Sequence, residues 1–72
     1  WMIEVADLVM YAQPEKAVGT LTFLKLANRT KHRIGNRSGL VLEMYDDNVL
    51  VDFEGEIILV HKMFLKVISE SR

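Results

Sequence analysis

The alternation of apolar and polar positions is clearest in the C-terminal half of the chain, where short apolar runs are separated by turn-forming residues. Residues 39–45 predict one strand, and it ends at residues 46–48, because Asp and Asn favour turns by bonding their own backbone. Residues 49–53 alternate apolar and polar side chains, as a half-buried strand does. A tight turn is predicted at residues 54–56, because the central glycine takes a positive φ angle at little cost.

A third strand is predicted at residues 57–60 and a final one at residues 65–68. The intervening residues 61–64 are too few for an α-helix and predict a 3₁₀ turn. The third strand begins with three consecutive apolar residues, and alternation along a strand must turn at least one of them outward: Ile57, Ile58 and Leu59.

The N-terminal part predicts one strand at residues 3–11, with a bulge near residues 6 and 7 because the apolar positions do not alternate perfectly. Pro14 ends this strand, since proline has no backbone N–H to donate. The natural start is expected at Met2, and Trp1 is set aside as an addition.

Residues 14–27 allow either a helix or a strand. A proline followed by an acid is a good helix start, and an apolar stripe at helical spacing follows. Gly19 and three β-branched residues around it favour extended structure instead, and we favour the strand. Residues 28–38 then form a polar, basic loop with a turn at Gly35 and Asn36.

The composition supports one domain over residues 2–72, with half of the residues hydrophobic. The chain has no cysteine, which excludes a disulfide framework and a thiolate metal site. No apolar run approaches the roughly 18–20 residues of a membrane span, and the N-terminus lacks a signal-peptide pattern. We therefore expect a cytoplasmic protein, in a host cell or a virion if a phage encodes it, without membrane partners.

The net charge of -1 conceals two blocks of opposite sign. Residues 16–42 contain no acid, and residues 43–56 contain six acids and no base. The basic block could neutralise phosphates of a nucleic acid or face an acidic protein surface or a sister subunit. The candidate binding residues of this block are Lys25, Arg29, Lys31, His32, Arg33 and Arg37.

Four segments together resemble the short SH3-like barrel proteins common in tailed-phage genomes: VADLVMY at 5–11, GLVLE at 39–43, VLVDF at 49–53 and LKVISESR at 65–72. The resemblance implies an all-β fold, a single small SH3-like barrel of about five strands with a 3₁₀ turn before the last strand. It also implies that the acid of the first segment lies in a turn just before the first strand. Ala6 stands where the family usually has glycine, which argues against a sharp positive-φ turn there.

In such a barrel, residues 12–38 are an enlarged, basic, insertion-like first loop. Proteins of this kind are mostly uncharacterised, so the resemblance implies a binding module more than any chemistry. SH3-like barrels of the KOW and Sm-like groups bind nucleic acid, but one fold hosts many functions.

The remaining chemistry in the sequence is sparse. Three aromatic residues could line a groove for proline-rich peptides, although the basic first loop argues against it: Tyr11, Tyr45 and Phe64. The acids near residue 47 lack the spacing of a calcium loop, so we expect no metal and no cofactor. Two histidines and no glycine-rich phosphate loop give no catalytic constellation, and we expect no enzymatic activity and no small-molecule substrate.

We therefore predict a non-catalytic module that binds a protein partner, either itself or a virion or host protein. Binding would use the enlarged first loop and an exposed apolar patch, for which the candidates are Leu50, Ile58 and Met63. The alternative is a small nucleic-acid-binding protein that uses the basic segment at residues 25–37.

Overall fold

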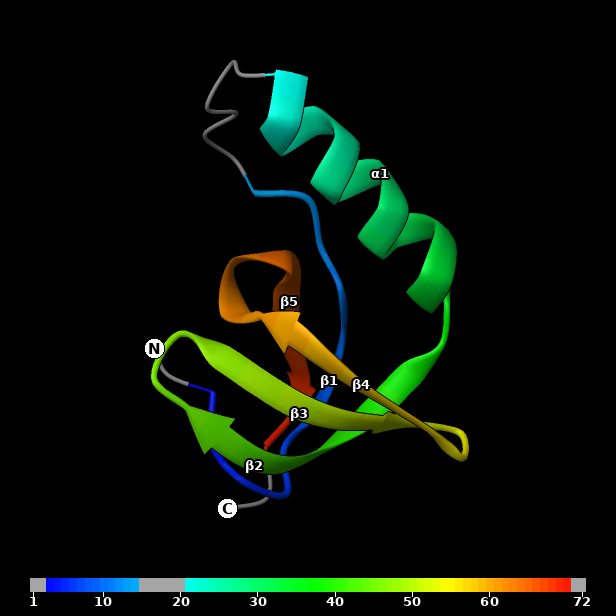
Figure 1. The fold of residues 1–72 in the computed structure, drawn as a ribbon. Coiled ribbons are helices and arrows are strands. Elements are labelled where there is room, and N and C mark those ends of the chain that lie inside the picture. The colour runs from blue at the N-terminus through cyan, green and yellow to red at the C-terminus, as the bar shows by residue number, and fades with distance from the viewer. Residues whose placement is uncertain (1–2, 15–20, 71–72) are drawn as a thin grey trace.

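The structure is a computed structural model that describes residues 3–14 and 21–70. The described part is mostly β, with one α-helix and one 3₁₀ turn (Figure 1). In chain order the elements are β1 (Leu8–Tyr11), α1 (Leu21–Ile34), β2 (Ser38–Tyr45), β3 (Asn48–Phe53), β4 (Glu56–His61), the 3₁₀ turn η1 (Lys62–Phe64) and β5 (Leu65–Ser69). The strands form one antiparallel sheet in the order β4-β3-β2-β1-β5, so β4 and β5 are its edges.

The two predicted hairpins and the 3₁₀ turn are confirmed. The β2–β3 turn has Asp46 at a φ of 52°, and the β3–β4 turn has Glu54 at 54° and Gly55 at 99°. The Gly55 N–H donates to Asp52 Oδ1 at 2.8 Å, which is the local side-chain bond expected of Asp in a turn. In η1, the His61 Nδ1 accepts a hydrogen bond from the Met63 N–H at 3.1 Å.

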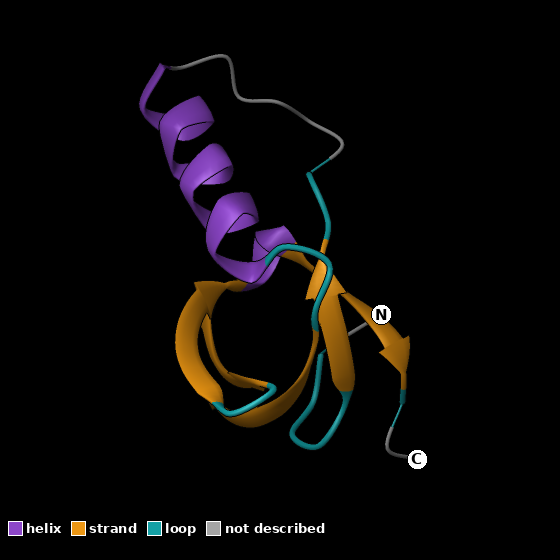
Figure 2. Cartoon of the chain, turned by 90° about the vertical axis from the view of Figure 1, so that its right-hand side faces the viewer, coloured by secondary structure: helices purple, strands orange, loops and turns teal. Residues whose placement is uncertain are grey.

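The hydrophobic core lies on the inner side of the sheet, which curls strongly and carries α1 over one end (Figures 1 and 2). Val49, Val51 and Phe53 alternate along β3 and are fully buried, as their spacing predicts. Gly39 lies so close to β3 that an added Cβ would stand 2.4 Å from a Val51 methyl and 2.6 Å from the Phe53 ring. The tight packing of the core therefore depends on a residue without a side chain at this position.

The first strand is shorter than predicted, because a turn occupies residues 4–7 and β1 begins at Leu8. Ala6 has a φ of 75°, so the expectation that its side chain precludes a positive-φ turn is wrong. The turn is fixed by β2: the Ala6 N–H donates to the Val41 carbonyl at 2.8 Å, and the Val41 N–H donates to the Asp7 carbonyl at 2.9 Å. Asp7 is fully buried just before β1, and its Oδ2 accepts from the Glu4 N–H at 2.9 Å.

The main correction concerns the segment between β1 and β2. Residues 21–34 form an α-helix, so the predicted strand is wrong over its described part and the predicted basic loop is helical as far as Ile34. Residues 15–20, which include the glycine that favoured a strand, lie outside the described part, as does Trp1. The turn predicted at Gly35 is confirmed: Gly35 has a φ of 63° and its N–H donates to the Lys31 carbonyl, as at many helix ends.

Candidate interaction surfaces

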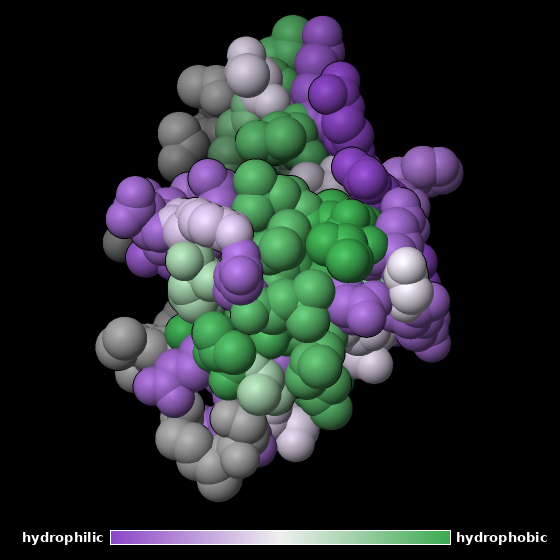
Figure 3. Space-filling model, turned by 60° about the horizontal axis from the view of Figure 1, so that its bottom comes forward, coloured by the Kyte–Doolittle hydropathy of each residue, from purple (hydrophilic) through white to green (hydrophobic). Residues whose placement is uncertain are grey.

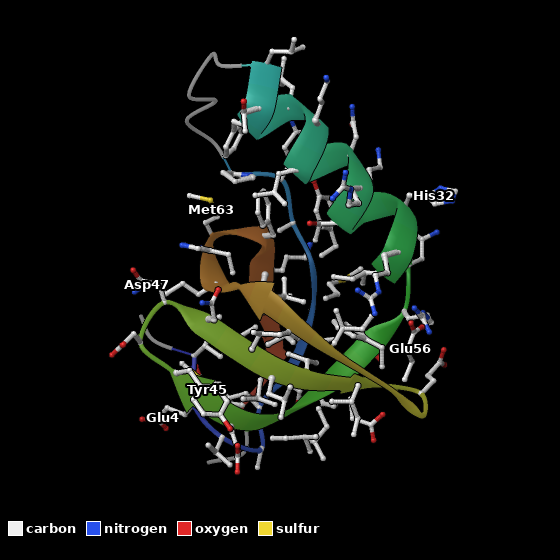
Figure 4. The ribbon with its side chains drawn as sticks, viewed as in Figure 1. Glu4, His32, Tyr45, Asp47, Glu56 and Met63 are labelled. Atoms are coloured by element: carbon white, nitrogen blue, oxygen red, sulfur yellow. The ribbon has the colours of Figure 1, made fainter. Side chains whose placement is uncertain are left out.

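Three of the predicted basic residues form one exposed stripe on α1. Lys25, Arg29 and His32 are spaced by four and three residues, which places them on the same side of a helix. All three side chains are exposed, and His32 points away from the sheet (Figure 4). None of them forms an ion pair with another residue of the described part, and α1 contains no acid. We call Lys25, Arg29 and His32 the basic helix face.

Arg37 has a structural role and is not free for a partner. Its guanidinium donates to the Ile34 carbonyl at 3.1 Å and to the Arg33 carbonyl at 2.6 Å, both at the C-terminal end of α1. It also donates to the Phe53 carbonyl at 3.3 Å, and its carbon lies 5.9 Å from the centre of the Phe53 ring. Arg37 thus caps the helix and ties it to the end of β3.

Glu56 neutralises part of the predicted basic set. One of its carboxylate oxygens lies 3.0 Å from Arg37 Nη2, and the other lies 3.6 Å from Arg33 Nε. The hydrogen bond from Arg37 is the main reason why the pKa of Glu56 is lowered from its ordinary value. Figure 4 shows Glu56 beneath the C-terminal end of α1. Arg37 therefore ties the helix end to the sheet, and Glu56 neutralises part of the charge of Arg33 and Arg37.

Lys31 projects to a different side of α1 from Arg33. It lines a hollow of about 440 Å³ together with Tyr11, Asn28, His32, Gly35 and Asn36. The Tyr11 hydroxyl donates to the Ala27 carbonyl at 3.5 Å on this side of the helix. The six predicted residues thus fall into three groups: the basic helix face, the two arginines that contact Glu56, and Lys31 at the hollow.

The outer side of the sheet carries an exposed apolar area that is visible as a continuous surface in Figure 3. Strand pairing fixes which residues share this side. One row across the strands is Leu40, Asp52 and Ile57, and the next is Glu43, Leu50 and Leu59. We call these six residues the outer sheet face.

The predicted apolar patch is correct in part. Ile58 points inward and is only 4% exposed, so its assignment to the patch is wrong; Ile57 and Leu59, at 58% and 56% exposed, take its place. Leu50 does belong to the outer sheet face and is half-buried. Met63 is exposed but lies apart, on η1 (Figure 4).

The outer sheet face is acidic as well as apolar. Glu43 and Asp52 lie within its two rows, and Glu54 follows at the β3–β4 turn. The Tyr45 hydroxyl donates a hydrogen bond to the Glu43 carboxylate, and this bond is the main cause of a raised Tyr45 pKa. Two carboxylates therefore lie among the exposed leucine and isoleucine side chains.

A groove of about 150 Å³ separates the helix from the free edge of β4. Leu26 and Arg29 of α1 line one side, and Ile58 and Leu59 of β4 line the other. Arg29 belongs to the basic helix face and Leu59 to the outer sheet face, so the groove runs between the two surfaces.

A larger hollow of about 620 Å³ lies between the β2–β3 turn and η1. Its lining includes Met44, Asp46, His61 and Met63. Nearby, the Lys62 ammonium lies 3.2 Å from an Asp47 carboxylate oxygen. No three His, Cys, Asp or Glu side chains in residues 3–14 and 21–70 converge as metal ligands. The described part of this lining mixes apolar side chains with Asp46, His61 and Lys62 and contains no nucleophile next to a base.

The three aromatic residues considered for a peptide groove do not line a common surface. Phe64 is buried and stacks on Tyr11, with 6.3 Å between ring centres, whereas Tyr45 is exposed beside Glu43. This arrangement does not support recognition of a proline-rich peptide by these residues.

Sequence reasoning missed Ile57 and Leu59 because it did not fix the parity of β4. Phe53 supplies the missing signal: it ends an alternating inward set, and the two-residue turn that follows places Glu56 opposite it. Counting onward from Glu56 shows that Ile58 and Val60 point inward and that Ile57 and Leu59 point outward.

Comparisons with protein-family models, with curated proteins and with solved structures found no match for this chain. In the described residues, no helix has both the length and the apolar character needed to cross a membrane.

Proposed function

We propose that this protein is a non-catalytic interaction module that binds a protein partner through its outer sheet face. The main support for this proposal is that Ile57 and Leu59 are each more than half exposed and lie beside Leu50 on an otherwise well-packed sheet. Contiguous exposed apolar areas with polar rims are typical of protein-binding surfaces. The position on the edge strand β4 also leaves backbone groups available to a partner.

We further propose that the curled sheet is an SH3-like barrel of the phage type. Support comes from the antiparallel order β4-β3-β2-β1-β5, from η1 between β4 and β5, and from the buried acid in the turn before β1. In this reading the enlarged first loop contains α1, and the insertion carries the features that distinguish this protein from a minimal barrel.

A photo-reactive side chain at position 59 tests the proposed binding surface. In cells that carry the gene, the protein with the probe at Leu59 should become cross-linked to a specific protein, which can be a second copy. The matched control has the probe at Lys66, an exposed residue on the opposite edge strand β5. Equal cross-linking from both positions, or none from position 59, would contradict binding through the outer sheet face.

The second candidate function is nucleic-acid binding by α1. It is favoured by one observation, the spacing of Lys25, Arg29 and His32 on one exposed side of an acid-free helix. The substitution of Lys25 and Arg29 by Ser should weaken oligonucleotide binding. It should also reduce the slope of log K against log salt by up to about two units, since each phosphate contact contributes about 0.7–0.9. An unchanged slope would exclude these residues as the phosphate contacts.

A further inference from the structure

We propose that the outer sheet face binds helix α1 of a second copy of this chain, in a head-to-tail contact. This inference rests on the proposed function, because it names the occupant of the same surface. It requires that the two surfaces match in charge, in apolar character and in size, and that both are open on one molecule.

The two surfaces have opposite charge. The basic helix face has two permanent cations, Lys25 and Arg29, and no acid lies anywhere on α1. The outer sheet face has Glu43 and Asp52 within its rows and no base. Charge complementarity of this kind brings unlike surfaces together and disfavours contacts between two identical sheets, whose acids would repel each other.

Both surfaces also expose apolar side chains that lie outside the hydrophobic core. Leu21 lies one helical turn before Lys25 and is 68% exposed, and Leu26 is exposed beside the groove along β4. On the sheet, Ile57 and Leu59 are the counterparts. An apolar centre with charged surroundings is the usual anatomy of a protein interface.

The dimensions agree. Fourteen residues of α1 extend about 21 Å at a rise of roughly 1.5 Å per residue. The six residues of β3 or β4 extend about 20 Å at roughly 3.3 Å per residue. The three strands β2–β4 span about 10 Å at a spacing of roughly 4.8 Å, close to the width of one helix.

The helix is available for such a contact because its own sheet covers little of it. Only Ala27 and Ile34 of α1 are buried, and both lie in its C-terminal two-thirds. Figure 1 shows the N-terminal end of α1 projecting beyond the sheet. Within one molecule His32 points away from the sheet (Figure 4), and Lys25 and Arg29 are exposed, so each copy has one donor and one acceptor surface.

A contact between two different surfaces is heterologous and generates rings or open chains. One helix that packs along three strands makes a small interface. Its area is at or below the roughly 1,200 Å² that is typical of weak, transient complexes. The association should therefore depend on protein concentration and weaken with added salt, because its charged rim is exposed to solvent.

The other possible occupant of the basic helix face is a nucleic acid, but the outer sheet face would repel it. The phosphates of a nucleic acid have a charge opposite to that of the basic helix face only. A second copy of the chain offers a surface of opposite charge to each of the two surfaces. In addition, α1 has no exposed aromatic residue for base stacking: Phe23 is half-buried, with its ring centre 5.8 Å from that of Phe64.

Sedimentation velocity on two complementary variants tests the proposal. The sheet variant is Leu59→Glu, and the helix variant combines Lys25→Glu with Arg29→Glu. All three side chains are exposed, so both variants should fold, which circular dichroism checks. Wild-type protein should increase in mass with concentration, and each variant alone should associate at least tenfold more weakly. An equimolar mixture of the two variants should form dimers and nothing larger, because only one intact surface remains on each partner.

Lys66→Glu, an exposed charge reversal on β5, is the control and should associate like wild type. Wild-type protein that stays monomeric at all concentrations, or that binds a mixed-sequence oligonucleotide through α1 as a monomer, would overturn the proposal. So would a mixture of variants that fails to dimerise while wild type associates. If position 59 still cross-links to a different protein in those cases, binding by the outer sheet face stands and only the occupant is wrong.

Discussion

The hairpin sheet β2–β4 and the helix α1 differ in how much of each is buried. In β3, three of six residues are fully buried, and both neighbouring strands pair with it along its length. In α1, two of fourteen residues are buried. The sheet thus contributes more of the buried core than the helix does, and most side chains of the helix are exposed.

The helix is attached through a few specific contacts. Phe23 packs against Phe64, Ile34 is buried in the core, and Arg37 bonds the helix end to β3 and to Glu56. Substitutions in the sheet should therefore affect the whole molecule, and substitutions at these contacts should affect the helix first.

The largest expected effect is in the sheet core. Phe53→Ala removes a fully buried ring that packs closely against Gly39. The substitution should lower the free energy of unfolding by about 3–5 kcal/mol. The matched change in the helix, Leu21→Ala, should cost about 0.5 kcal/mol or less, since this side chain is mostly exposed. Urea denaturation followed by circular dichroism measures both, and similar losses would refute the division between sheet and helix.

The second prediction distinguishes the stability of helix α1 from that of strand β3. Arg37→Ala removes the charged donor from three carbonyl groups and should cost about 2 kcal/mol. Amide hydrogen exchange should accelerate in α1 well before it accelerates in β3, because the helix loses its cap. Arg29→Ala is the control, since this exposed arginine forms no ion pair in the described part. Uniform acceleration in both elements would show that Arg37 supports the whole fold equally.

A smaller gain is expected at the turn before β1. Ala6 has a positive φ angle that glycine adopts without a steric penalty, so Ala6→Gly should stabilise the protein by roughly 0.5–1 kcal/mol. The effect should increase the denaturation midpoint without changing the slope of the transition. A loss of stability would mean that the Ala6 methyl makes a contact that outweighs the backbone strain.

The smallest effect is electrostatic. Because Arg37 lowers the pKa of Glu56 in the folded state, the ionised carboxylate stabilises the protein above its ordinary pKa of 4.5. This contribution is lost as the pH falls through the lower, folded-state value. Glu56→Gln should therefore reduce the thermal midpoint slightly at pH 7 and match wild type at low pH. A difference that does not change between neutral and acidic pH would exclude the ion pair as its source.

Much of the fold could be predicted from the sequence because its hairpins are specified locally. The Asp-Asp-Asn and Glu-Gly-Glu turns and the alternation through Val49, Val51 and Phe53 determine strands and register within a few residues of each other. The helix could not be predicted with the same ease, because the β-branched residues before it favour a strand. Its inward positions, Phe23, Ala27 and Ile34, mix an aromatic, a small and a β-branched residue and make a weak stripe.

The sequence was enough to predict a basic surface and an exposed apolar surface. It was not enough to predict which residues belong to each. The two charge blocks of the sequence reappear as a basic helix and an acidic hairpin sheet. Proximity in sequence could not show that Arg33 and Arg37 bind Glu56, since this pairing crosses about twenty residues and depends on how α1 sits over β4. The register of β4 likewise decided that Ile57 is exposed and Ile58 is buried.

Methyl NMR of wild-type protein over a dilution series tests directly whether the helix of one copy docks on the sheet of the next. We expect the methyl signals of Ile57, Leu59, Leu21 and Leu26 to shift together as the concentration rises, while the core methyl signals of Val49 and Val51 stay in place. This result would show that the outer sheet face and the helix become covered in one process. Concentration-independent signals at both surfaces, or shifts confined to β5, would contradict the docking of one copy's helix on the sheet of the next.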